Sequence, residues 1–291
     1  ADLWPRVRWW DREGVAERLD GVSSAEMTKL RTGMEGGQVA VDCPEDEALD
    51  LVAVVLSHAD RFLPPREGGT EFVKGAEFRI ELEDGDGGEP TSVPQQRFTP
   101  LEKMYLDAWQ ERKLKDGTFA VSTSPWRARL VLVPKQLPCH MSRHSDPAEL
   151  PEGTDVGALF RACLDMRALN KRTKPFQFPL PHVEDVLLAL HGCTRAVGLD
   201  VADAFTTLHL RPADQPMTAF RTHDRVLMHC SASQGAKNSA AAWAAVMADT
   251  MEGCGGDAPD GGRWVVAHYQ DDLVVAAATH EGLLRAFASA M

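Results

Sequence analysis

The segment RWVVAHYQDDLVVAAAT, residues 263–279, decides how the rest of the chain is interpreted. Two apolar arms flank a short polar tip, and this pattern predicts a β-hairpin whose turn presents Asp271 and Asp272. Two adjacent carboxylates repel each other; at about 4 Å and an effective dielectric near 20, the cost is on the order of 4 kcal/mol. A solvated turn relieves that repulsion, so the hairpin alone is explained equally well by an ordinary polar loop.

The segment RAVGLDVADAF, residues 195–205, supplies further carboxylates. It predicts a strand that ends at Asp200, with Asp203 one turn later. If this strand lies beside the hairpin in one sheet, Asp200 and Asp271 converge. Clustered carboxylates are tolerated around hard cations, so the pattern predicts a Mg²⁺ site, with Mn²⁺ as the alternative ion. Two such ions about 4 Å apart activate a hydroxyl nucleophile and stabilise a leaving pyrophosphate.

Predicted helices and strands occupy most of the chain after residue 97. Helices are expected where apolar residues follow helical spacing, at residues 47–63, 99–117, 181–193, 239–253 and from 280 onward. Strands are expected at residues 77–82, 128–133 and 160–166, and a basic turn follows at 167–175. Trp126 and Trp243 are expected in the core.

The composition is that of an ordinary globular protein. Of the 291 residues, 44% are hydrophobic and 25% are charged, which excludes a disordered chain, a collagen-like fibre and a disulfide miniprotein. No apolar run approaches the ~20 residues of a membrane span, and the charged N-terminus lacks the apolar stretch of a signal peptide. Six cysteines without a repeated CxxC indicate reduced thiols. We therefore expect an intracellular protein with no membrane partner.

The net charge of −12 argues against a nucleic-acid partner at first sight, but the charge is unevenly distributed. Residues 1–96 hold 10 basic and 21 acidic residues, whereas residues 97–181 hold 14 basic and 9 acidic residues. The acidic excess thus lies in the lead-in segment, and the stretch that follows is locally basic.

Residues 136–159 are polar, contain three prolines and show no periodicity, which predicts a long loop. Cys139, His140 and His144 lie within it, but the CHxxxH spacing lacks the further ligands of a zinc site. A plain exposed insertion is therefore the favoured interpretation.

Several segments, taken together and in order, resemble a known family. Three resemble the palm motifs of retroelement reverse transcriptases: LDVADAF (199–205), SQGAKNSAAAW (233–243) and YQDD (269–272). Three others resemble the fingers of gypsy-type LTR retrotransposons: STSPWRARLVLVPK (122–135), FRACLDMRALNKRTKPFQFPLPHVEDVL (160–187) and MTAFRT (217–222). YxDD alone is a weak motif, but motifs in the family's order and spacing are specific. The similarity covers roughly residues 70–291.

The resemblance implies an α+β fold with the fingers and palm of a right-hand polymerase, in which helices pack on an antiparallel palm sheet. It assigns residues 97–174 and 208–238 to the fingers and residues 175–207 and 239–291 to an incomplete palm, after an acidic lead-in at 1–96. The loop at 136–159 becomes an insertion in the fingers. Because Met291 lies 19 residues after Asp272, we expect the thumb and ribonuclease H portions of a parent polyprotein to be missing from this chain.

The resemblance also implies the site residues. Asp200, Asp271 and Asp272 match catalytic carboxylates that bind metal, and the backbone of Val201 completes the metal site. The positions that match nucleotide-binding residues are Lys135, Arg161, Asp203, Ala204, Phe205, Gln234 and Gly235. The positions that match template-binding residues are Arg167, Asn170, Lys171 and Arg172, which lie in the basic turn.

Some of these positions have a specific implied role, and two features, Phe205 and the basic turn, also have an ordinary alternative. Arg161 and Lys135 match residues that grip the incoming triphosphate, for which a guanidinium is well suited. Phe205 matches a steric gate whose ring clashes with a ribose 2′-hydroxyl; the alternative is a core aromatic residue. The basic turn has the alternative of a solvated charged loop.

The implied function is template-directed addition of deoxynucleotides to a primer 3′-hydroxyl on an RNA or DNA template, by two-metal phosphoryl transfer. The implied partners are the primed template and deoxynucleoside triphosphates, in a cytoplasmic particle or the nucleus. Two alternatives stay open: a catalytically silent or domesticated remnant that binds nucleic acid or protein, and other nucleotide chemistry such as that of a cyclase. Ser233-Gln234-Gly235 stands where gypsy-type elements usually carry Pro-Phe-Gly and is closer to retroviral enzymes, which leaves the subfamily open.

Overall fold

The computed structural model describes residues 50–51, 54–55, 72–83, 85, 89–180, 182–201, 203–257 and 263–291. The chain divides into two compact units, and each is described by itself. The first unit contains residues 1–66, 181–201 and 247–291, and the second contains residues 67–180 and 202–246. Most of the helix expected at 47–63 lies outside the described residues. Within the described residues, no helix is both long and apolar enough to cross a membrane.

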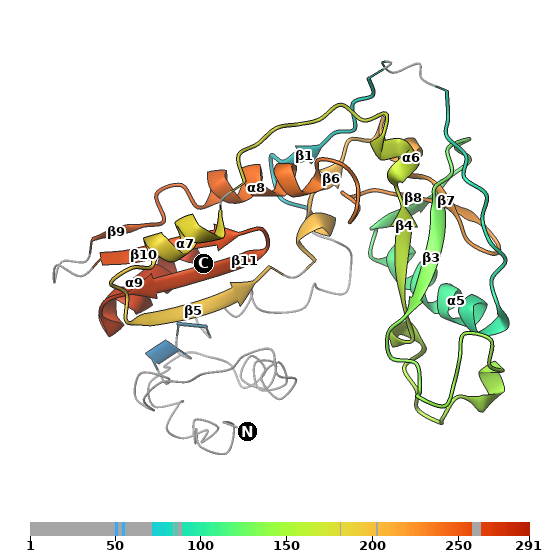
Figure 1. The fold of residues 1–291 in the computed structure, drawn as a ribbon, viewed down its shortest axis with the longest axis horizontal. Helices are drawn as coiled ribbons and strands as arrows, with labels where there is room; N and C mark the ends of the chain where they lie inside the picture. The colour runs from blue at the N-terminus through green and yellow to red at the C-terminus, as the bar shows by residue number, and fades with distance from the viewer. Residues whose placement is uncertain are drawn as a thin grey trace. The chain divides into compact units, whose positions relative to one another are not determined.

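The first unit is built on a four-stranded antiparallel sheet with the order β5-β11-β10-β9 (Figure 1). Its strands are β5 (Arg195–Asp200), β9 (Gly256–Asp257), β10 (Arg263–Tyr269) and β11 (Asp272–Ala277). Helix α7 (Val183–Ala189) contacts β10, and helix α9 (His280–Ala290) contacts β11, β10 and β5. The predicted hairpin and its flanking strand therefore lie in one sheet.

Helix α9 covers one face of this sheet. Leu273, Val275 and Ala277 point to that face and are buried. The helix begins after Thr279, whose hydroxyl accepts a hydrogen bond from the Gly282 N–H at 3.1 Å. A Cβ at Gly282 would lie 3.2 Å from the Cβ of Ala277, so glycine relieves crowding where the helix approaches the sheet.

The second unit contains small sheets and one long helix. Strands β2 (Phe119–Val121), β8 (Val226–His229) and β7 (Phe220–Arg221) form an antiparallel sheet in that order. Strands β3 (Arg129–Pro134) and β4 (Phe160–Asp165) form a second antiparallel pair, and β1 (Glu77–Phe78) pairs in parallel with β6 (His209–Leu210). The helices are α5 (Pro100–Lys115), the single turn α6 (Arg167–Asn170) and most of α8 (Ser239–Thr250). Short 3₁₀ turns lie at Pro147–Glu149, Val156–Ala158, Ala204–Thr207 and Gln215–Thr218.

Helix α5 forms where the sequence predicts it, because both of its ends are specified locally. Thr99 and Glu102 make a reciprocal capping box at its start, and Gly117, at φ 76°, follows its end. Its buried face carries Leu106 and Trp109 into an aromatic core, where the rings of Trp109 and Phe119 lie 5.0 Å apart. Burying each such side chain contributes about 1.5–3 kcal/mol.

The loop at 136–159 corrects one expectation, because part of it belongs to the core. Met141 and Leu159 are buried against the core of α5, β3 and β4. Arg143 forms an ion pair with the fully buried carboxylate of Glu102, and the Arg143 carbonyl accepts a hydrogen bond from the Thr99 hydroxyl at 2.7 Å. A plain exposed insertion is therefore wrong. These apolar residues are few and lie on an irregular backbone. A search for periodic apolar spacing therefore cannot detect that they belong to the core.

The other predicted elements agree with the structure in type. Residues 77–82 alternate exposed and buried positions as predicted, although only Glu77–Phe78 pair as a strand. Trp126 and Trp243 are buried, as predicted for core residues. The α+β fold class, with a helix packed on an antiparallel sheet, is confirmed.

Candidate active site

The first unit brings the predicted carboxylates together through strand register. Strands β5 and β11 pair so that Asp200 lies directly opposite Asp272. Opposed residues on antiparallel strands point to the same face of the sheet. Asp271 occupies the adjoining turn, and its carbonyl accepts a hydrogen bond from the Val201 N–H at 3.1 Å. The backbone thus places three acidic residues and Val201 at one corner of the sheet.

The hairpin turn between β10 and β11 has only two residues, Gln270 and Asp271. Gln270 adopts φ 56°, a left-handed conformation that is uncommon for residues other than glycine, asparagine and aspartate. Two-residue hairpin turns require such a conformation to match the twist of their strands. The tight turn therefore fixes where Asp271 stands relative to Asp272, at the cost of some backbone strain.

Among the residues that the structure describes, no basic side chain balances the charge of the three carboxylates. Asp200 and Asp272 are exposed, and Asp271 is partly exposed. Within the described residues, no ion pair joins any of the three to a basic side chain. Their oxygens do not form a group within 4.8 Å of one another, in contrast to a cluster described below. Like charges placed opposite each other without a cation repel, which accounts for this spacing.

The sheet face that carries Asp200 and Asp272 is open along β5. Ala196, Gly198 and Asp200 are exposed, whereas the intervening residues of β5 are partly buried. A Cβ built at Gly198 would meet nothing within 4 Å, leaving the glycine and its neighbours out. The corner with the carboxylates thus adjoins an uncovered strip of small side chains.

The second unit carries the positions expected to grip a triphosphate. Arg161 lies on β4 opposite Val133 of β3, and Lys135 follows the end of β3, where its N–H donates to the Leu159 carbonyl at 2.9 Å. Both basic side chains are exposed. Neither forms an ion pair with a described carboxylate, so both are free to meet an anion from solution.

The expected nucleotide-flanking residues Asp203, Ala204 and Phe205 form a short turn in this unit. Asp203 has φ 52°, and its carbonyl accepts hydrogen bonds from the N–H and the hydroxyl of Thr206 at 2.7 and 2.9 Å. Ala204 is buried, and Phe205 is partly buried. The partial burial of Phe205 is compatible with both the gate role and the core role.

The basic turn makes more contacts with the rest of the protein than a solvated loop would. Arg167 binds Asp165 through two guanidinium nitrogens, at 2.8 and 2.6 Å, and these contacts lower the pKa of Asp165 to about 2. Arg172 donates to the Glu89 carbonyl and lies over the ring of Trp126, 5.2 Å from its centroid. Lys171 is exposed, whereas Asn170 hydrogen-bonds the Gln234–Gly235 turn.

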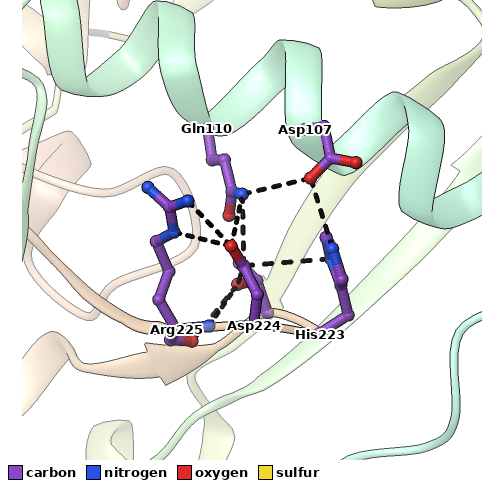
Figure 2. A network of polar contacts seen from close by, with 6 residues as sticks. Asp107, Gln110, His223, Asp224 and Arg225 are labelled. Carbon is purple, nitrogen blue, oxygen red and sulfur yellow. Dashed lines mark hydrogen bonds and ion pairs between the residues drawn. The ribbon is translucent and has the colours of Figure 1, made fainter.

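A second acidic cluster, which no sequence motif predicts, lies where α5 meets the turn between β7 and β8 (Figure 2). One possible ligand atom from each of Asp107, His223 and Asp224 lies within 4.8 Å of the others. Here, however, protein groups already occupy the carboxylates. Asp224 accepts from Arg225 at 2.9 Å and from the amide of Gln110 at 3.1 Å, and His223 Nε2 lies 3.2 Å from Asp107.

The pKa of Asp224 reflects the hydrogen bonds that protein donors make to its carboxylate. Burial alone raises the pKa of this carboxyl, but hydrogen bonds from Arg225, Thr222 and Gln110 lower it to about 2. A metal ion would have to displace these donors. The cluster is therefore best explained as a structural tie between helix and hairpin. Asp107 and Asp224 are too far apart in sequence for any local pattern to have revealed it.

Comparison with known proteins finds similar sequences and folds. Residues 157–291 match the family model described as reverse transcriptase (RNA-dependent DNA polymerase). The chain is 25% identical over 191 residues to the retrovirus-related Pol polyprotein from transposon opus of Drosophila melanogaster, covering 65% of this chain and 17% of the polyprotein. It is 28% identical over 152 residues to the transposon Tf2-3 polyprotein of Schizosaccharomyces pombe, covering 51% of this chain and 10% of that protein.

Solved structures of the foamy viral protease-reverse transcriptase share the fold. One from the prototype foamy virus matches with a TM-score of 0.64 and 19% identity, over 87% of this chain and 30% of that one. Another, in complex with an RNA/DNA hybrid, matches with a TM-score of 0.61 and 18% identity, over 88% of this chain and 32% of that one. The chain thus spans less than a third of each of these viral and transposon proteins.

The chain therefore shares its α+β fold with the foamy viral protease-reverse transcriptase structures. Residues 157–291 match the model of the reverse transcriptase family, and the relatives that resemble the chain are retrovirus-related and transposon polyproteins.

Proposed function

We propose that this chain is the reverse transcriptase part of an intracellular retroelement polyprotein. It adds deoxynucleotides to a primer 3′-hydroxyl on an RNA or DNA template by phosphoryl transfer. The observation that carries the proposal is the register of β5 and β11, which sets Asp200 opposite Asp272 with Asp271 in the adjoining turn. The related polyproteins are much longer than this chain, so thumb and ribonuclease H portions are proposed to act with it.

The carboxylate corner fits a pair of divalent cations by its donor set. Asp200, Asp271, Asp272 and the Val201 backbone offer only oxygen ligands, which Mg²⁺ and Mn²⁺ prefer. The lack of a basic side chain at the three carboxylates within the described residues leaves a negative charge that a cation would balance. When bound, such ions stabilise the charge on the attacking and leaving oxygens.

The second unit supplies groups suited to the nucleotide and template in this proposal. Arg161 and Lys135 would hold the triphosphate, since an exposed guanidinium and ammonium that pair with no described carboxylate favour phosphate. Phe205 would exclude the 2′-hydroxyl, with Asp203 and Ala204 beside it, and the Gln234–Gly235 turn would flank the nucleotide. Lys171, Arg167 and Arg172 would contact the template backbone.

The decisive experiment is primer extension on an RNA template with Asp271→Asn. The substitution keeps the shape of the side chain and removes the charge that would hold a metal ion. We expect extension to fall by about 10³-fold or more, because metal ions contribute several kcal/mol to such transition states. Asp249→Asn, at an exposed carboxylate on α8, is the matched control and should retain full activity.

Two outcomes would reject the proposal. Equal extension by Asp271→Asn and the wild-type chain would remove the metal-binding role of the hairpin. A wild-type chain that binds primed template but never extends it with Mg²⁺ or Mn²⁺, even when the thumb portion is supplied, would instead identify a silent binding module.

A further inference from the structure

We propose that Asn170 and Asn238 form a clamp that positions the Gln234–Gly235 turn for the incoming nucleotide. The inference rests on the proposed function, because that function gives the turn its place beside the nucleotide. The sequence contains only two asparagines among 291 residues, and they join the same two segments, 170–176 and 235–238. We call these two residues the asparagine clamp.

Asn170 holds the turn from the side of α6. Its Nδ2 donates to the Gly235 carbonyl at 2.9 Å, and its Oδ1 accepts from the Lys237 N–H at 2.8 Å. One amide thus fixes two backbone groups on either side of Ala236. A carboxylate of the same shape could accept but not donate, so aspartate cannot replace asparagine here.

Asn238 makes a second pair of hydrogen bonds between the same two segments. Its Nδ2 donates to the Lys174 carbonyl at 2.8 Å, and its Oδ1 accepts from the Phe176 N–H at 2.9 Å. Its backbone has φ 77°, a left-handed conformation that asparagine tolerates better than most residues. The ammonium of Lys237 adds a hydrogen bond to the Thr173 carbonyl at 2.6 Å.

The turn needs this support because packing does not hold its tip. Gln234 and Gly235 are exposed, Gly235 has φ 89°, and a Cβ built there would meet nothing within 4 Å. Below the tip, the Ser239 hydroxyl donates to the Ser233 carbonyl at 3.0 Å and closes the base of the turn. An exposed turn held in one conformation before binding avoids the entropic cost of ordering it with the ligand.

In the clamp, Asn170 acts on the Gln234–Gly235 turn and not on the template, the role that the resemblance implied for it. It couples the basic turn to the nucleotide-flanking turn, so a change in one alters the backbone of the other. Asn170 and Asn238 are therefore positioning residues.

The test uses the whole chain with two variants and one control. Asn170→Asp keeps the shape and removes the donor to Gly235. Asn238→Gly removes the side chain and keeps a residue that adopts φ 77° without strain. Gln177→Ala, at an exposed amide one residue beyond Phe176, is the control. Hydrogen exchange of residues 233–239 and the KM and kcat for a deoxynucleotide on a primed RNA template are measured for each.

Each clamp variant should raise KM for the nucleotide about fivefold to tenfold and change kcat less than twofold. This is the effect of losing about one net hydrogen bond. Amide exchange in residues 233–239 should become about tenfold faster, while the melting temperature and the Gln177→Ala control stay unchanged.

Unchanged KM and exchange in both variants would overturn the clamp. A fall in kcat together with the melting temperature would also overturn it, because that pattern reports general damage to the fold. A wild-type chain that makes no product would overturn the proposed function and the nucleotide role of the turn. Exchange would still decide whether the clamp holds it, since that measurement needs no activity.

Discussion

The two acidic clusters of this protein handle their charge in opposite ways. In the second unit, Asp224 is compensated by the guanidinium of Arg225 and by the buried amide of Gln110. In the first unit, Asp200 and Asp272 face each other across two strands, and within the described residues no basic side chain pairs with either. By distance alone, the cluster that contains Asp224 has the tighter group of ligand atoms.

The difference shows that a tight group of ligand atoms is weaker support for a metal than uncompensated charge. A carboxylate that already accepts hydrogen bonds from protein donors contributes to folding without an ion. Carboxylates that are held opposite each other and left without donors raise the free energy of the folded state until a cation arrives. The comparison therefore favours a structural role for Asp224 and supports the metal-binding role proposed for Asp272.

A third kind of ionisable group, a buried histidine that stays uncharged, extends the comparison. It gives the largest predicted effect on stability. His229 is buried, neither ring nitrogen has a hydrogen-bond partner, and the ring of Phe119 lies 4.6 Å away. Burial lowers the pKa of His229 from 6.5 to about 3. Because the unfolded chain binds the proton first, stability should be complete above pH 6.5 and decline toward pH 3, by on the order of several kcal/mol.

Denaturant unfolding between pH 7 and pH 4 measures this effect. The variant His229→Leu should lose much of the acid sensitivity, whereas His140→Leu, at an exposed histidine of the 136–159 loop, should keep it. Parallel pH profiles for His229→Leu and the wild-type chain would show that another group controls acid unfolding.

Removing the compensated carboxylate should have the next largest effect. Asp224→Ala leaves the amide of Gln110, which is 1% exposed, without its main acceptor, and we expect a loss of about 2 kcal/mol in the free energy of unfolding. Equilibrium urea unfolding at pH 7 checks it. Because the pKa of Asp224 is lowered to about 2, its contribution should be complete above pH 4 and decline only as the pH falls toward 2.

This prediction separates the two clusters directly. If Asp224→Ala is as stable as the wild-type chain, or more stable, then Asp224 does not stabilise the fold. The two clusters would then not differ in how their charge is compensated.

The smallest effect is predicted at the uncompensated pair, with the opposite sign. Asp272→Asn removes one of two opposed like charges and should raise the melting temperature in the absence of metal by about 1–3 °C. Addition of Mg²⁺ should raise the melting temperature of the wild-type chain more than that of the variant. Thermal unfolding with and without Mg²⁺ checks both statements, with Asp249→Asn as the control. A lower melting temperature for Asp272→Asn would show that this carboxylate stabilises the fold.

Local signals in the sequence predict much of this structure. The capping box at Thr99 and the two apolar arms around Gln270 are complete within a few residues, so α5 and the hairpin follow from pattern alone. The pairing of Asp200 with Asp272 needed a further assumption, that β5 joins the same sheet, which local sequence does not contain.

Contacts between distant segments were not predictable in the same way. Asn170 and Gly235 lie 65 positions apart, and Gln110 and Asp224 lie 114 apart. Such hydrogen bonds leave no periodic trace, because they depend on where the fold places two loops. The scarcity of asparagine in the chain was a usable signal for the clamp, and it would have pointed to Asn238.

Gly198 illustrates how folding and activity can favour different residues at one position. Glycine weakens a strand interior, and there is room for a larger side chain above it, so Gly198→Val should strengthen β5. The same valine would project from the open face beside Asp200 and crowd any polymer that passes over it. Gly198 thus gives up strand stability and keeps the surface beside Asp200 free of a bulky side chain.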